Sequence, residues 1–376
     1  MKIIEDRRMD ISLVAVETKE AFFTQLSKCI TEKLGKTNAK QLIEFSKLYY
    51  DRHPLDDLEG ASISDIFGNL HCWWNFILER QANQANVRVF NPNLAEDGWL
   101  CNHTVITVVQ KDMPFLVDSI RMEINRCDIA IHEVKSVLVI TARDHKGELI
   151  EILPTGGKHK DTKTKIYQKE ALIYFELNLF TDESAMTDLH QDILSVMDSV
   201  NLVVDDYRPM LAQIDHVCEN LKQAGGGVLP AAAIESQEFL KWLADGHFTL
   251  MGYSEYELKG TKGNRVLSEN PSKRLGIFGA SNKITEAVNV DDFNPGMSRF
   301  HLTPQVLSFT KSAIRSKVHR NAYSDYVVVK RFDKKGQVDG ECRFLGLYTS
   351  PVYTLSPTKI PVVREKIQHV LDRSGI

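Results

Sequence analysis

The stretch KDMPFLVDSIRME, residues 111–123, joins two different patterns and decides the expected fold. It follows the run VITVVQ, whose β-branched residues are typical of a strand, and it leads into residues 117–127, where apolar side chains recur at helical spacing. Pro114 suits the first turn of a helix, because the N–H that proline lacks would be unpaired there in any case. The stretch therefore predicts a strand that turns directly into a helix.

The surrounding pattern between residues 99 and 205 alternates in the same way. Residues 129–153 are expected to form a pair of strands joined by a hairpin turn. Residues 171–180 are expected to form a further strand, and residues 183–200 a helix with one apolar face. The order strand, helix, strand, strand, helix is close to the ferredoxin-like βαββαβ arrangement, with its last strand weak or missing.

The flanking regions complete an expected α+β fold. Apolar residues at every fourth position predict an N-terminal helical region, and period-two patterns return after residue 247. Three glycines, residues 225–227, are a plausible boundary. The expected domains are a helical region at 1–98, a ferredoxin-like domain at 99–205, a helical linker at 206–236, a second antiparallel-sheet domain at 237–352 and a final helix at 353–376.

The composition excludes several classes of protein. The chain has 376 residues and a formal net charge of -4, and a nucleic-acid partner would normally require a clear basic excess. Its six cysteines are scattered and form no C-x-x-C pair, which argues against a metal ribbon or a dithiol site. The charged N-terminus and the lack of a run of about 20 apolar residues predict a cytoplasmic protein with no membrane partner.

Residue patterns that usually carry catalysis were not found in the sequence. It contains no G-x-G-x-x-G dinucleotide fingerprint and no G-x-S-x-G nucleophile elbow. His103 and His132 fall in expected strands, where a structural histidine is the better interpretation. We therefore predict no catalytic, cofactor-binding or metal-binding residue and no cofactor within this chain.

One basic cluster lies near the C-terminal part of the chain. KSAIRSKVHR holds five cationic or titratable side chains within ten residues: Lys311, Arg315, Lys317, His319 and Arg320. Guanidinium groups pair well with carboxylates and phosphates, so an anion-binding loop or a charged subunit contact is one interpretation. A solvated loop is the other interpretation, and we favour it.

The junction at residues 111–118 is the second candidate site. The N-terminus of a helix leaves amide N–H groups unpaired and favours negative charge nearby. Asp112, Pro114, Phe115 and Asp118 lie at this corner, which could bind a carboxylate or an amino acid. We name these four residues the strand–helix corner.

Several long motifs of the chain resemble the N-terminal region of the large bacterial NAD-specific glutamate dehydrogenases. They occur in family order from roughly residue 20 to the end, and they are KDMPFLVDS (111–119), FLKWLADGHFTLMGYSEYEL (239–258), KSAIRSKVHRNAYSDYVVVKRFD (311–333), RFLGLYTS (343–350) and PTKIPVVREK (357–366). The resemblance implies an ACT-like domain at 99–205 and a PAS-like domain at 237–352. It also implies that the NAD and glutamate sites lie in a downstream catalytic part of the same polypeptide.

The resemblance leaves three functional hypotheses. The leading one is a non-catalytic regulatory and assembly fragment of an NAD-dependent glutamate dehydrogenase that deaminates L-glutamate to 2-oxoglutarate and ammonia. The others are a sensor for an amino acid or small ligand and a complete enzyme with an unrecognised site. ACT domains often carry D-x-P-G at the corner, and Phe115 stands where that glycine would be, which favours docking over effector binding. Exposed sheet edges predict a homo-oligomer.

Overall fold

The computed structural model describes Val14 and residues 18–58, 60–81, 84–156, 159–223, 230–280 and 287–374. The chain divides into two compact units, residues 1–197 and 198–376, and each is described by itself. The three glycines at 225–227, which the sequence suggested as a boundary, lie outside the described residues. Within the described ranges, no helix combines the length and the apolar character needed to cross a bilayer.

The first unit begins with two helices, which lie in the region predicted to be helical. α1 (Lys19–Tyr50) is capped by Thr18, whose Oγ1 accepts a hydrogen bond of 3.3 Å from the amide of Ala21, and it is kinked at Gly35, which has a φ of 75°. α2 (Ile63–Ile77) packs against α1. Their contact is apolar and fully buried, and it includes Leu26, Leu42, Leu70 and Trp73.

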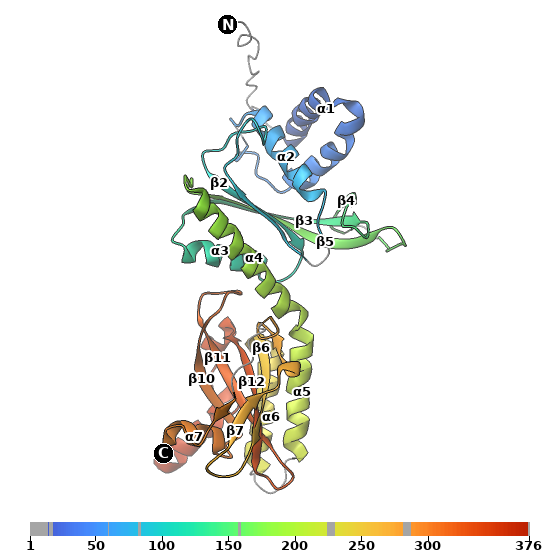
Figure 1. The fold of residues 1–376 in the computed structure, drawn as a ribbon. Helices are drawn as coiled ribbons and strands as arrows, with labels where there is room; N and C mark the ends of the chain where they lie inside the picture. Colours follow the sequence, from blue (N-terminus) through green and yellow to red (C-terminus); the bar gives the residue numbers. More distant parts are fainter. Residues whose placement is uncertain are drawn as a thin grey trace. The chain divides into compact units, whose positions relative to one another are not determined.

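A five-stranded antiparallel sheet follows these helices. Its elements are β1 (Asn86–Phe90), β2 (Thr104–Lys111), α3 (Leu116–Arg126), β3 (Ile131–Arg143), β4 (Leu149–Pro154), β5 (Ile166–Leu177) and α4 (Glu183–Asp205). The strand order is β1-β2-β5-β3-β4. Helices α1 and α2 cover one face of the sheet, and α3 and the first part of α4 cover the other (Figure 1). The predicted helices α3 and α4 are present, but three strands (β3, β4 and β5) separate them, one more than the βαββαβ order has.

β1 explains why the last strand of the ferredoxin-like pattern is weak in the sequence. The edge of β2 that does not pair with β5 pairs with β1, and Asn86 lies opposite Val109. A strand that precedes the motif in the chain thus occupies the place beside its first strand. Residues 86–90 fall in the region predicted to be helical, and the structure places them in the sheet instead. The sequence NVRVF alternates polar and apolar side chains, a short strand signal that the helical assignment of residues 1–98 passed over.

The two faces of the first sheet are buried by different partners. Val105, Val109, Leu172 and Tyr174 belong to the apolar cluster that includes α1 and α2. The side chains of Ile106, Val108, Ile173 and Phe175 alternate with them along the same strands and are also buried. Successive residues of a strand point to opposite faces, and here both faces are buried. The sequences of β2 and β5 are therefore nearly continuous apolar runs.

The second unit is built on a larger antiparallel sheet. Its elements are α5 (Tyr207–Gln223), α6 (Pro230–Trp242), a π-helical turn (Leu243–His247), β6 (Phe248–Lys259), β7 (Val266–Glu269), β8 (Leu275–Gly276), β9 (Val288–Asn289), α7 (Pro295–Leu302), β10 (Leu307–Arg315), β11 (Tyr323–Phe332), β12 (Val338–Tyr348) and α8 (Val363–Ser374). Short 3₁₀ turns occupy Pro271–Lys273, Ser350–Thr354 and Pro357–Lys359. The strand order is β10-β11-β12-β6-β7-β9, and β8 pairs with β6.

Helices α5 and α6 cover one face of this sheet through apolar contacts. Met210 and Leu240 from the helices share a buried cluster with Val327 and Phe344 from the strands. β11 and β12 form a hairpin, which the amide of Asp333 closes by donating a hydrogen bond of 2.8 Å to the carbonyl of Gln337. The expected second antiparallel sheet is therefore present, while its PAS-like assignment and the exact domain limits stay predictions.

Candidate functional site

The strand–helix corner brings most of its predicted residues together. β2 ends at Lys111 and α3 begins at Leu116, with Phe115 as the N-cap residue. A cavity of about 190 Å³ opens here, and its lining includes Asp112, Phe115 and Asp118 together with side chains of β3 and β5. Pro114 does not line the cavity, and it precedes the N-cap instead of lying in the first helical turn as predicted.

Phe115 adopts a backbone conformation that usually belongs to glycine. Its φ is 74° and its ψ is 0°, in the left-handed helical region. An L-residue with a Cβ pays roughly 1–2 kcal/mol there, which glycine does not. The position therefore has a backbone conformation that glycine adopts without strain, and Phe115 is among the residues that line the cavity.

The two acidic residues of the corner have different surroundings. Asp112 donates a backbone hydrogen bond of 2.8 Å to the carbonyl of Lys169, and its carboxylate lies 2.9 Å from the ammonium of the same residue. Asp112 is thus tied to β5. Asp118 is exposed in the first turn of α3 and lines the cavity mouth.

The basic cluster at 311–320 lies at the end of β10 and in the loop before β11. Lys311 pairs with Asp325 at 2.7 Å, and Arg315 stacks 4.6 Å from the centre of the Tyr323 ring. Arg320 donates to the carbonyl of Tyr348 at 2.6 Å. These three cations have partners within the second unit, and Lys317 and His319 are engaged in interactions as well. The anion-binding interpretation stays a prediction.

A buried ion cluster in the first unit escaped the sequence analysis. Both Arg80 and Arg143 donate to the carboxylate of Glu170, at 2.9 Å from Arg80 Nε and at 2.8 and 2.9 Å from Arg143 Nε and Nη2. Burial opposes the charge on Glu170, yet the guanidinium groups hold the pKa of its carboxyl below the ordinary value. Arg143 also donates to the carbonyls of Ile77 and Gly147, so the cluster ties the end of α2 to the β3–β4 hairpin.

A second buried cluster lies on β11 and β12 of the second unit. The ammonium of Lys330 lies 2.5 Å from a carboxylate oxygen of Glu341, and both side chains are shielded from solvent. Arg343 Nε donates to the same carboxylate at 2.7 Å, and His301 Nδ1 lies 3.3 Å from it. Burial lowers the pKa of Lys330. Burial alone would raise the pKa of Glu341, but His301, Arg343 and Lys330 hold it far below its ordinary value.

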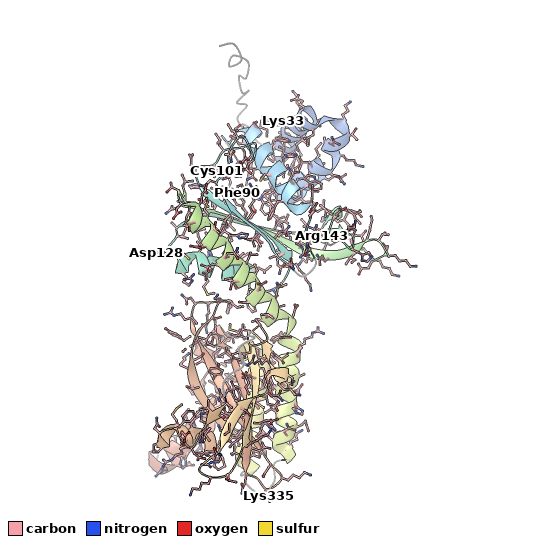
Figure 2. The ribbon with its side chains drawn as sticks, viewed as in Figure 1. Lys33, Phe90, Cys101, Asp128, Arg143 and Lys335 are labelled. Carbon is pink, nitrogen blue, oxygen red and sulfur yellow. The ribbon has the colours of Figure 1, made fainter. Side chains whose placement is uncertain are left out.

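Titratable side chains also gather at the start of β2. His103 Nδ1 lies 2.8 Å from Glu176 Oε2, and Cys101 lies close enough for the three ligand atoms to fall within 4.8 Å of one another. His132 stacks on His103 with ring centroids 4.3 Å apart. Both histidines have hydrogen-bonding partners, since His132 Nε2 lies 2.7 Å from the side-chain oxygen of Asn178. Figure 2 shows Cys101 and Arg143 at opposite ends of the first sheet.

Comparisons with known proteins agree with this architecture. Residues 45–193 match the family model of the ACT1 domain of glutamate dehydrogenase. The chain is 33% identical over 363 residues to the NAD-specific glutamate dehydrogenase of Halomonas elongata, and 34% identical over 360 residues to that of Pseudomonas aeruginosa. A protein of the same name from Mycobacterium tuberculosis is 23% identical over 277 residues, which are 71% of this chain and 15% of that protein.

The alignments cover nearly all of this chain but only a small part of each relative. They include 96% and 95% of this chain for the first two relatives but only 22% of either relative. The chain therefore spans less than a quarter of the length of these relatives. The matches confirm the resemblance that the sequence motifs predict.

Proposed function

We propose that this chain is a regulatory and assembly region of an NAD-specific glutamate dehydrogenase. The premise is that the chain is a relative of these enzymes and carries their ACT1 domain. The alignment of nearly the whole chain with 22% of each of the first two relatives carries the proposal. On this view the remaining polypeptide binds NAD and deaminates L-glutamate to 2-oxoglutarate and ammonia. The proposal retains the expectations of a cytoplasmic location and of a homo-oligomer.

The internal pairing of charged groups supports a structural role for this region. Glu170 and Glu341, two of its most deeply buried acids, are each held by two or more cationic side chains of the same unit. Lys311 and Arg320 of the basic cluster are likewise bonded to groups of the second unit. Groups held in this way stabilise a scaffold, whereas a general acid or base must remain free to exchange a proton with a substrate.

The proposal predicts where glutamate oxidation takes place. We expect the 376-residue chain to give no glutamate-dependent reduction of NAD, followed by NADH absorbance, under conditions where a longer enzyme containing it is active. In that longer enzyme, deletion of residues 45–193 should change the subunit number or the response to amino acids and leave NADH binding intact. NADH formation by the chain alone, or loss of NADH binding on deletion, would contradict the proposal.

The corner cavity favours a second candidate function, an amino-acid sensor. In this case Phe115→Gly should enlarge the cavity and relieve roughly 1 kcal/mol of backbone strain. We then expect calorimetry to show glutamate or aspartate binding at least about tenfold more tightly than to the unchanged chain, a gain of about 1.4 kcal/mol. Phe115→Ala is the matched control, because it removes the ring but keeps a Cβ at positive φ. If the unchanged chain, Phe115→Gly and Phe115→Ala all fail to bind either amino acid measurably, the sensor hypothesis is wrong and docking is the role of the corner.

A further inference from the structure

We infer that Cys101, His103 and Glu176 form a binding site for a divalent transition-metal ion, with Zn²⁺ as the best fit. The thiol sulfur, the imidazole nitrogen and a carboxylate oxygen lie within 4.8 Å of one another. Zinc bonds of about 2.0–2.3 Å in tetrahedral geometry place ligand atoms roughly 3.5 Å apart, so small side-chain movements suffice to close the site. The site is independent of the NAD chemistry proposed above.

The three side chains are held by a regular part of the fold. Cys101 and His103 lie just before β2, and Glu176 lies near the end of β5, which pairs with β2 through Thr104 and Leu177. The hydroxyl of Thr104 donates to Asn91 at 2.6 Å and accepts from the amide of Phe180 at 2.8 Å. These bonds fix the backbone beside His103. Ligands on a rigid sheet end need little reorganisation to bind an ion.

Neighbouring groups orient the ligands as they do in metal sites. The hydroxyl of Tyr174 donates to Glu176 Oε1 at 2.7 Å, while Glu176 Oε2 faces His103 Nδ1. The ring of His132 stacks on His103 and is itself fixed by Asn178. Hydrogen bonds of this kind set the direction of a ligating carboxylate or imidazole. The carboxylate oxygen that faces the imidazole is therefore the one we assign as the ligand.

The local charge pattern calls for a cation. Glu133 on β3 lies directly opposite Glu176 on β5, next to an irregularity in the strand pairing at residues 131–133. Like charges in directly opposite positions destabilise a sheet. Lys135 offsets part of this repulsion, but its ammonium is engaged with Glu133 at 2.6 Å. A divalent ion at this site would neutralise the carboxylate of Glu176. It would also neutralise the thiolate that forms when Cys101 loses its proton to bind the ion.

The ligand types select the metal. Thiolate and imidazole favour Zn²⁺ and its neighbours in the first transition series, whereas Mg²⁺ and Ca²⁺ prefer oxygen ligands alone. A cysteine binds metal as its thiolate, so the ion must displace the thiol proton of Cys101. Three protein ligands leave a fourth position for water or a small ligand.

A second group of similar composition serves as the matched control. Glu123, Cys127 and Asp192 also lie within 4.8 Å of one another. Arg126, however, donates to Glu123 at 2.8 Å and to Asp192 at 3.0 Å, so a cation already occupies that group. Among the residues that the structure describes, these are two cysteine-containing groups of similar composition, and Arg126 bonds to two acids of the second group.

The test is metal binding by the 376-residue chain after removal of metal by a chelator. We expect one equivalent of Zn²⁺ to bind in competition with a chromophoric chelator, and Co²⁺ to give a thiolate-to-metal absorption band. Cys101→Ser should abolish that band and weaken Zn²⁺ binding at least about 100-fold. Glu176→Gln should weaken it about 10-fold or more. Cys127→Ser should leave both the band and the affinity unchanged.

Two kinds of result would overturn the inference. One is the absence of stoichiometric Zn²⁺ binding by the unchanged chain. The other is an unaltered Co²⁺ band in Cys101→Ser, or its loss in Cys127→Ser. Circular dichroism of each variant checks that the fold is retained. If Cys101→Ser does not fold, His103→Gln replaces it and must weaken Zn²⁺ binding for the inference to stand.

Discussion

Glu170→Gln should lower the free energy of unfolding of the first unit by about 3–5 kcal/mol, the cost typical of leaving buried charges without their partner. The carboxylate of Glu170 is fully shielded from solvent, and it accepts hydrogen bonds from both Arg80 and Arg143. Removing its charge leaves two buried guanidinium groups facing each other. The same change loosens the link between α2 and the β3–β4 hairpin, which Arg143 holds together.

Urea unfolding followed by hydrogen exchange is the measurement for this variant, because peptides from β2 and β5 report on the first unit alone. Glu151→Gln is the matched control. Glu151 lies on β4 of the same sheet and pairs with Lys165 at 2.8 Å, but both side chains are about one-third exposed. Exposed pairs contribute about 1 kcal/mol or less. Equal effects of the two substitutions would show that the Glu170 cluster does not stabilise the unit.

The effect of Glu170→Gln should depend on pH in a defined direction. The pKa of Glu170 is lowered in the folded chain by Arg143 and Arg80, against the effect of burial. Its contribution to stability is therefore complete above the pKa of an unfolded glutamate, about 4.3, and is lost as the pH falls through the lower folded value. We expect the difference between the unchanged chain and the variant to be largest near neutral pH and to shrink in acid.

The order of elements could be predicted because each one carries its own local signal. β-branched runs and helical spacing are visible within single segments, as in residues 104–126, and the structure follows them. β1 was missed because its short alternating run follows long helical segments and was assigned with them, and its pairing with β2 becomes visible only in the fold. Fold class therefore follows from the sequence, whereas the pairing of a short edge strand depends on tertiary contacts.

Charged partners are harder to predict than elements, because they are distant in the chain. Glu170 lies 90 residues from Arg80 and 27 from Arg143. His103 and Glu176 are 73 residues apart and meet only through the register of β2 and β5. The basic cluster shows the reverse case. The five clustered positions are obvious in the sequence, but the partners of two of them are visible only in the fold. Lys311 pairs with Asp325, and Arg320 donates to the carbonyl of Tyr348.

Glu341→Gln should have the largest effect on the second unit, again about 3–5 kcal/mol of its free energy of unfolding. It leaves the buried ammonium of Lys330 without its carboxylate, 4.9 Å from the centre of the Phe300 ring. Lys330→Met should cost clearly less. Glu341 would then still be held by Arg343 and His301, and the methionine side chain fills most of the space of the lysine stem.

The asymmetry between these two substitutions separates an ion-pair effect from a packing effect. If the charge is what matters, the double variant Lys330→Met, Glu341→Gln should be more stable than Glu341→Gln alone, because the unpaired ammonium is gone. Hydrogen exchange of peptides from β11 and β12 in urea measures the stability of the second unit in each variant. The exchange of peptides from β2 and β5, in the first unit, should not change. A double variant that is less stable than both single variants would mean that Lys330 stabilises the unit through its packing and not through Glu341.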